Sequence, residues 1–158
     1  MLGGRNPRAP PKGELMQHRL RDVTILLARL VVGVTFVLHA YQKFVLNGIS
    51  GVGAGFEQMG IPMPVVAAGF TATVELLGGL ALVLGVLMPV AGVLLAAVML
   101  GALVTAHASA GFFATDGGFE YVLVLAATSL ALGFSGPKYT VQALFTGGAQ
   151  AERAEVDA

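Results

Sequence analysis

Four long apolar stretches dominate the chain, and short segments rich in glycine, proline or polar residues separate them. The stretches cover residues 23–46, 65–87, 90–108 and 119–135. An α-helix needs roughly 17–25 mostly apolar residues to cross the hydrocarbon core of a bilayer. The pattern therefore predicts an all-α integral membrane protein, built as an antiparallel bundle of four transmembrane helices that form one membrane domain over residues 23–140.

The first connection, residues 47–64, contains several glycines and two prolines, which preclude a long helix. We predict only a short helix at the membrane interface, over residues 53–60, with Phe56 and Met59 facing inward. Pro64 is a natural first residue for the helix that follows.

The second connection is a tight turn at Met88 and Pro89. So short a link fits only an antiparallel hairpin between the second and third stretches. Residues 109–118 connect the third stretch to the fourth, and the Gly136–Pro137 pair ends the fourth.

Composition supports the membrane assignment and excludes several kinds of site. Hydrophobic residues make up 56% of the chain and charged residues 11%, with a mean hydropathy of +0.80, whereas about a quarter of a soluble domain is charged. There is no cysteine, which excludes disulfides, cysteine-ligated zinc and iron–sulfur clusters, and CxxCH haem attachment.

The charges outside the stretches predict the topology. Residues 1–22 are basic and contain three prolines, so we expect a disordered cytoplasmic leader that does not bind nucleic acid; residues 141–158 should form a polar, acidic cytoplasmic tail. An even number of spans with lysine and arginine gathered at both ends places both termini in the cytoplasm. The first stretch contains Arg29 and no A-x-A site follows it, so we interpret it as a retained helix.

Ionisable residues interrupt the apolar stretches. Arg29, His39 and Lys43 lie on the first, Glu75 on the second, His107 near the end of the third and Glu120 at the start of the fourth. A charge near the bilayer centre costs roughly 2.5–3.5 kcal/mol, so such residues should face the bundle interior. Arg29 and Lys43 share one helical face.

Depth estimates suggest how these residues meet. Arg29 and Glu75 reach similar depths from opposite sides and are expected to pair, while Lys43, His107 and Glu120 fall near one depth on the outer side. The same pattern admits structural roles: one pair fixing helix register, a Lys43–Glu120 pair at the interface, or Glu120 as a carboxylate at a helix N-terminus.

Ligand chemistry also stays open. One hypothesis is a polar pocket of Lys43, His107 and Glu120, open toward the outer face and supported from below by Arg29 and Glu75. If a quinone binds there, His107 or Lys43 donates to a carbonyl, and Glu75 or Glu120 exchanges protons. A proton path through Glu75 and the histidines is an alternative. We expect no haem, because His39 and His107 are two candidates without a supporting pattern, and we expect neither a metal site nor a catalytic residue.

Small residues predict where helices pack closely. They surround Glu75 at Ala68, Thr71, Ala72, Gly78 and Gly79, and an Ala127/Ala131 stripe marks the fourth stretch. Such stripes allow close approach of transmembrane helices.

The succession LARLVVGVTFVLHAYQKF, FEQMGIPMP, ATVELLGGLALVLGVLMP, AHASAGFF, GGFEYVLVL and GPKYT resembles the DoxX family over residues 26–140. Ala40 departs from the family's frequent glycine before the lysine. The resemblance implies a four-helix, multi-pass protein of the bacterial plasma membrane. It also implies that Arg29, Lys43, Glu75, His107 and Glu120 each lie on a segment that matches a segment of the family.

The family also suggests functions. Some relatives are membrane subunits of quinone-linked oxidoreductases and others are linked to oxidative-stress complexes. The leading hypothesis is therefore a membrane subunit whose partners are the bilayer and soluble or membrane oxidoreductase subunits. The alternatives are a non-catalytic scaffold that anchors a soluble partner and a small proton or solute transporter.

Overall fold

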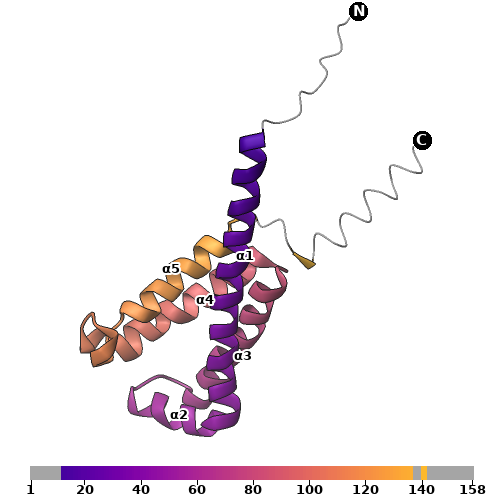
Figure 1. The fold of residues 1–158 in the computed structure, drawn as a ribbon. Coiled ribbons are helices and arrows are strands. Elements are labelled where there is room, and N and C mark those ends of the chain that lie inside the picture. Colours follow the sequence, from indigo (N-terminus) through magenta and orange to yellow (C-terminus); the bar gives the residue numbers. More distant parts are fainter. Residues whose placement is uncertain (1–11, 137–139, 142–158) are drawn as a thin grey trace, which may run out of the picture.

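A computed structural model of the chain describes residues 12–136, 140 and 141. Regular structure in this part of the chain is entirely helical (Figure 1). The α-helices are α1 Lys12–Tyr41, α2 Ile49–Gln58, α3 Pro64–Leu84, α4 Met88–Ala102 and α5 Glu120–Gly133. The π-helical segments η1 Gln42–Leu46 and η2 Leu103–His107 continue α1 and α4, and two short 3₁₀ turns follow, η3 Ala108–Ala110 and η4 Ala114–Asp116.

The four longer helices pack as two antiparallel hairpins. One hairpin joins α1 to α3 and the other joins α4 to α5; α3 packs against α4, while α1 and α5 touch each other much less. The short helix α2 packs on α3 and touches η1. We call the end of the molecule where α1 begins and α5 ends the terminal end, and the opposite end, which holds α2, the loop end (Figure 1).

Glycines set the spacing within each hairpin. A Cβ atom on Gly79 of α3 would lie 2.7 Å from the carbonyl oxygen of Gly33 on α1. In the other hairpin, a Cβ atom on Gly92 of α4 would lie 2.6 Å from the carbonyl oxygen of Ser129 and 2.8 Å from Cα of Gly133, both on α5. Backbone therefore meets backbone in both hairpins, as small residues allow between membrane helices.

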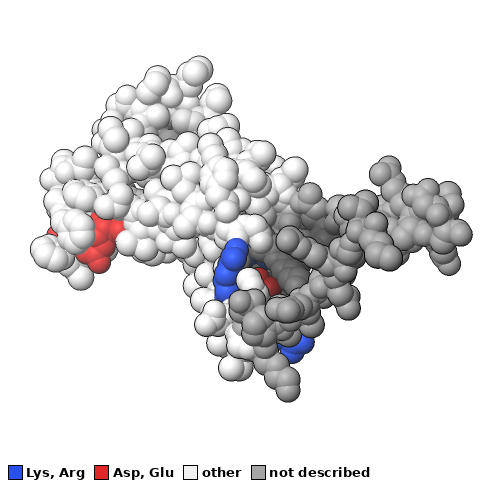
Figure 2. Space-filling model, turned by 90° about the horizontal axis from the view of Figure 1, so that it is seen from above, with Lys and Arg blue, Asp and Glu red and all other residues white. Residues whose placement is uncertain are grey.

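Three helical stretches of the described chain are long and apolar enough to cross a membrane: Met16–Leu46, Pro64–Leu84 and Met88–Ala110. The fourth predicted span is the shorter apolar helix α5, with 14 residues and a length of about 21 Å. Seen from the terminal end, most of the described surface carries no charge, and an acidic patch lies over the loop end of α4 and α5 (Figure 2). The chain is thus an all-α membrane protein.

The expected disordered leader is wrong for residues 12–22, because α1 begins at Lys12. Between Gly13 and Gly33 there is neither glycine nor proline to stop the helix, and helix propagation is favourable once a turn exists. Residues 1–11 lie outside the described residues, as do residues 142–158 of the predicted tail.

The predicted turn at Met88 and Pro89 is also displaced. The turn occupies residues 85–87, and Pro89 belongs to the first turn of α4, where a missing N–H costs nothing. Pro64 holds the equivalent place in α3, as predicted. In both connections the residue just before the helix, Met63 or Leu87, takes a positive φ.

Two predicted packing faces need correction. The helix in the first connection begins at Ile49, earlier than expected, so that Phe56 is half-buried but Met59 lies beyond the helix and is exposed. On α5, Ala127 and Ala131 are exposed. The buried face of α5 is instead formed by Val122, Leu125, Ala126, Ser129, Leu132 and Gly133.

Candidate functional site

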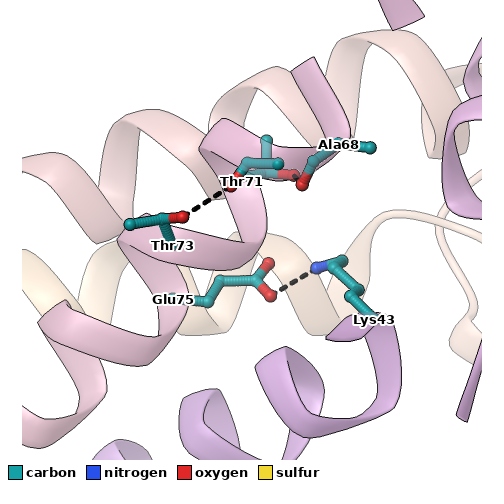
Figure 3. Close-up of polar contacts among 6 residues, drawn as sticks. Lys43, Ala68, Thr71, Thr73 and Glu75 are labelled. Carbon is teal, nitrogen blue, oxygen red and sulfur yellow. Dashed lines mark hydrogen bonds and ion pairs between the residues drawn. The ribbon is translucent and has the colours of Figure 1, made fainter. Parts of the chain in front are cut away.

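A lysine–glutamate ion pair lies between the helices of the first hairpin. Nζ of Lys43, on η1, contacts Oε2 of Glu75, on α3, within hydrogen-bonding distance (Figure 3). The Glu75 side chain is 2% exposed and that of Lys43 is 20% exposed. A carboxylate so buried is stable only with a partner of opposite charge, and Lys43 supplies that partner.

The depth of the pair follows from the helices that carry it. Glu75 lies near the middle of α3, about 16 Å from the first residue of that helix. Lys43 belongs to the π-helical segment at the end of α1. A π-helical turn changes the direction in which later side chains point, and the long lysine stem lets the ammonium reach the carboxylate.

The pair retains unused hydrogen-bonding capacity. The hydroxyls of Thr71 and Thr73 bond to carbonyls of their own helix, at Ala68 (3.1 Å) and Gly69 (2.7 Å), and not to the carboxylate (Figure 3). Among the described residues, Lys43 and Glu75 make one hydrogen bond with each other and no side-chain bond to another residue. An ammonium has three donors and a carboxylate can accept on both oxygens, so the pair can still donate to and accept from a ligand.

Arg29 occupies a different place from the one expected. Its Nε donates to the carbonyl oxygen of Leu82 (2.8 Å) and its Nη2 to that of Val83 (3.1 Å). These carbonyls belong to the last turn of α3, where a helix leaves acceptors unsatisfied and its dipole favours a cation. The predicted Arg29–Glu75 pair is therefore wrong, because Arg29 lies about two turns of α3 beyond Glu75.

Gly85 makes room for this arginine. It has φ +71° at the C-terminus of α3, a conformation that suits glycine. A Cβ atom here would also overlap the guanidinium of Arg29. The glycine that follows the apolar run is a C-cap signal, so the sequence contained this feature although our prediction extended the span past it.

His107 and Glu120 stabilise the connection between α4 and α5. Nδ1 of His107 lies 2.6 Å from the carbonyl oxygen of Gly117; because a carbonyl only accepts, this nitrogen carries the proton. Oε2 of Glu120 accepts from the backbone N–H of Ala114 at 3.2 Å. Glu120 also begins α5, as its interpretation as a helix N-terminal carboxylate requires.

The three residues expected at one depth on the outer side are not joined. No hydrogen bond or ion pair links Lys43 with His107 or Glu120 in the described part of the chain. Lys43 belongs to the first hairpin and the other two to the second. Within the same described residues, no group of three or more His, Cys, Asp or Glu side chains could hold a metal ion.

His39 and two residues absent from the predicted site bridge α1 and α5. The ring of half-buried His39 on α1 lies 6.1 Å, centroid to centroid, from the ring of Tyr121 on α5. Nearer the terminal end, Nη2 of Arg21 donates to the carbonyl oxygen of Ser135 at 3.1 Å. Sequence reasoning assigned Arg21 to the leader, and no pattern in the chain indicated its partner.

Comparisons with known proteins agree with the fold. The DoxX family model matches residues 24–108. The chain is 32% identical over 111 residues to "Putative oxidoreductase CatD" of Bacillus subtilis, covering 70% of this chain and 79% of that protein. It is 33% identical over 113 residues to "Uncharacterized membrane protein Rv3486" of Mycobacterium tuberculosis, covering 69% of each. No solved structure matches the chain significantly.

Proposed function

The chain belongs to the DoxX family, and on that premise we propose that it is a membrane subunit of a quinone-linked oxidoreductase or oxidative-stress complex. In this proposal four helices cross the bacterial plasma membrane, with both termini in the cytoplasm. The observation that carries the proposal is the Lys43–Glu75 pair, buried in the first hairpin with donors and acceptors to spare. The name of one relative, "Putative oxidoreductase CatD", supports the same direction.

The chemistry of the pair suits a quinone headgroup. An ammonium donates to a carbonyl oxygen, and a carboxylate accepts from, or passes a proton to, a hydroxyl. Lys43 therefore fits the role of donor to one quinone oxygen and Glu75 that of proton acceptor or donor. A quinone supplies two-electron chemistry, and a partner subunit that carries a redox group must supply or take the electrons, because this chain has no cysteine to hold a cluster.

The other predicted site residues take supporting roles in this proposal. Arg29 fixes the terminal end of α3 and thereby the height of Glu75. His39 lies one helical turn before Lys43 and contacts Tyr121, which makes it the candidate to exchange protons with the loop end. His107 and Glu120 hold the connection on which α5 begins.

Purification into lipid nanodiscs, followed by mass spectrometry of bound small molecules and proteins, tests the proposal. We expect quinone to copurify with the native chain, and saturable quinone binding to weaken at least tenfold in Glu75→Gln and in Lys43→Gln. Thr73→Val is the matched control, because Thr73 is exposed on the same helix and bonds only to its own backbone. The proposal is refuted if quinone does not copurify and shows no saturable binding. A soluble protein that is retained without quinone would favour the scaffold.

A further inference from the structure

The helix α2 lies beside both elements that carry the ion pair. It packs on α3 and touches η1, the segment that contains Lys43. A Cβ atom on Gly53 would lie 2.9 Å from Cγ2 of Val65, and one on Gly69 would lie 3.9 Å from Cγ2 of Ile49. α2 therefore runs antiparallel along the first turns of α3, with its first residue nearest to Glu75.

This helix buries fewer of its residues than the neighbouring α-helices do. Gly53 is its one buried residue, whereas α3 buries six, Glu75 among them. Ile49, Val52 and Phe56 form a half-buried stripe toward the bundle, and the opposite face is exposed. Few buried contacts are the mark of a segment that opens locally at low free energy.

Two glycines inside α2 lower its helical stability further, and close packing against a neighbour requires neither of them. Gly51 and Gly55 lie inside the helix, and a Cβ atom at either would meet nothing within 4 Å. Glycine is the least favourable residue in a helix interior after proline. α2 is also flanked by Gly48, with φ +68°, and Gly60, with φ +72°, both in open space, so the chain can bend at either end of the helix.

We propose that α2 is a gate, which opens by unwinding locally between Gly48 and Gly60 and admits an amphiphilic ligand from the loop-end leaflet to the Lys43–Glu75 pair. The inference rests on the proposal that this pair is a ligand site. Glu75 is 2% exposed in the closed arrangement, so a headgroup reaches the carboxylate only after a neighbouring element moves. Of the α-helices near the pair, α2 has the fewest buried residues to lose.

Access to the pair can be measured without any ligand. The chain has no cysteine, so a single Gly69→Cys substitution gives a background-free probe for a membrane-impermeant maleimide in nanodiscs. Gly69 is half-buried on α3, and a Cβ atom there lies 3.9 Å from Cγ2 of Ile49 on α2, so the thiol is covered while α2 is closed. Adding Gly51→Ala and Gly55→Ala favours the helical, closed form, and we expect the labelling rate to fall roughly tenfold or more. The matched control is Gly101→Ala on α4, where a Cβ also meets nothing within 4 Å and labelling should be unchanged.

Hydrogen–deuterium exchange of residues 47–63 provides the second measurement. We expect amides of α2 in the native chain to exchange at least a hundredfold faster than those of α3 around Glu75, and the double alanine variant to slow them. Native α2 amides as protected as those of α3, unchanged labelling despite a stabilised α2, or equal slowing by Gly101→Ala would each overturn the gate. Failure of quinone to bind would leave these rates as they are, so the two proposals fail separately.

Discussion

The two hairpins of this protein share one packing device and differ in polarity. Each brings two helix backbones together at glycines, Gly33 with Gly79 in the first hairpin and Gly92 with the α5 backbone in the second. In the described residues, however, the buried charged side chains, Arg29 and Glu75, both belong to the first hairpin. The second hairpin buries apolar side chains and the hydroxyl of Ser129.

In our proposal the second hairpin supports the fold, and the first hairpin carries the groups that bind a ligand. A tight, apolar hairpin is sufficient to make a stable wall in a bilayer, because backbone approach and dispersion supply the association. The first hairpin keeps a charged pair that such packing does not need, and replacing buried ion pairs with apolar residues is often neutral or stabilising. A contribution to stability is therefore a weak explanation for the pair, which is why our proposal gives it a functional role.

The largest expected effect comes from breaking that pair on one side only. Lys43→Met leaves the carboxylate of Glu75 buried without its partner and should lower the free energy of unfolding by about 3–5 kcal/mol. Glu75→Leu should cost less, since the Lys43 side chain is already 20% exposed and can turn toward the interface. The double variant should return to within about 1 kcal/mol of the native chain. Equilibrium unfolding in detergent measures all three, and a double variant as unstable as Lys43→Met would mean that the pair holds the fold together.

An intermediate effect should appear equally in both hairpins. Gly79→Ala and Gly92→Ala each force a methyl group against backbone atoms of the partner helix, and overpacking of this kind costs about 1–3 kcal/mol. Thermal unfolding of the two variants in the same detergent makes the comparison. Gly101→Ala serves as the control, because its methyl group enters open space and should stabilise α4 by about 0.5–1 kcal/mol. If only one hairpin responds, the shared packing device is refuted.

The smallest expected effect concerns the polar group of the second hairpin. Oγ of Ser129 is fully buried and has no hydrogen-bond partner among the described residues. Ser129→Ala removes an unsatisfied hydroxyl and should raise the free energy of unfolding by about 1 kcal/mol. Ser135→Ala, which deletes a hydroxyl bonded to the Leu132 carbonyl at 2.8 Å, should instead be neutral or slightly destabilising in the same assay. A loss of stability in Ser129→Ala would show that this hydroxyl has a partner.

Local rules in the sequence predicted much of the framework. Apolar runs located the helices, since burying or immersing apolar surface is a property of each stretch by itself. Pro64 marked the first turn of α3 because proline tolerates only that place in a helix. The small residues around Glu75 correctly predicted tightly packed faces of α3, on which Ala68, Ala72, Gly78 and Gly79 are buried.

The same local rules did not predict which side chains pair with one another across helices. Depth counted along straight α-helices assigned Arg29 to Glu75, whereas the guanidinium lies on the Leu82 and Val83 carbonyls. Lys43 reaches the Glu75 carboxylate from a π-helical segment that no sequence pattern predicted. The Ala127/Ala131 stripe failed similarly, because helical periodicity cannot say which of two small-residue faces meets a neighbour.

By itself, the sequence determined that this is an all-α membrane protein, which residues are too polar to face lipid, and which stretches of the chain form the long helices. Those properties depend on composition and on residues close in the chain. Only the tertiary structure decided that Lys43 pairs with Glu75, that Arg29 holds the end of α3, and that His107 and Glu120 serve a loop of the other hairpin. Ion pairs and hydrogen bonds are formed over a few ångströms, so helix rotation, a single π-helical turn and the choice of neighbouring helix determine them.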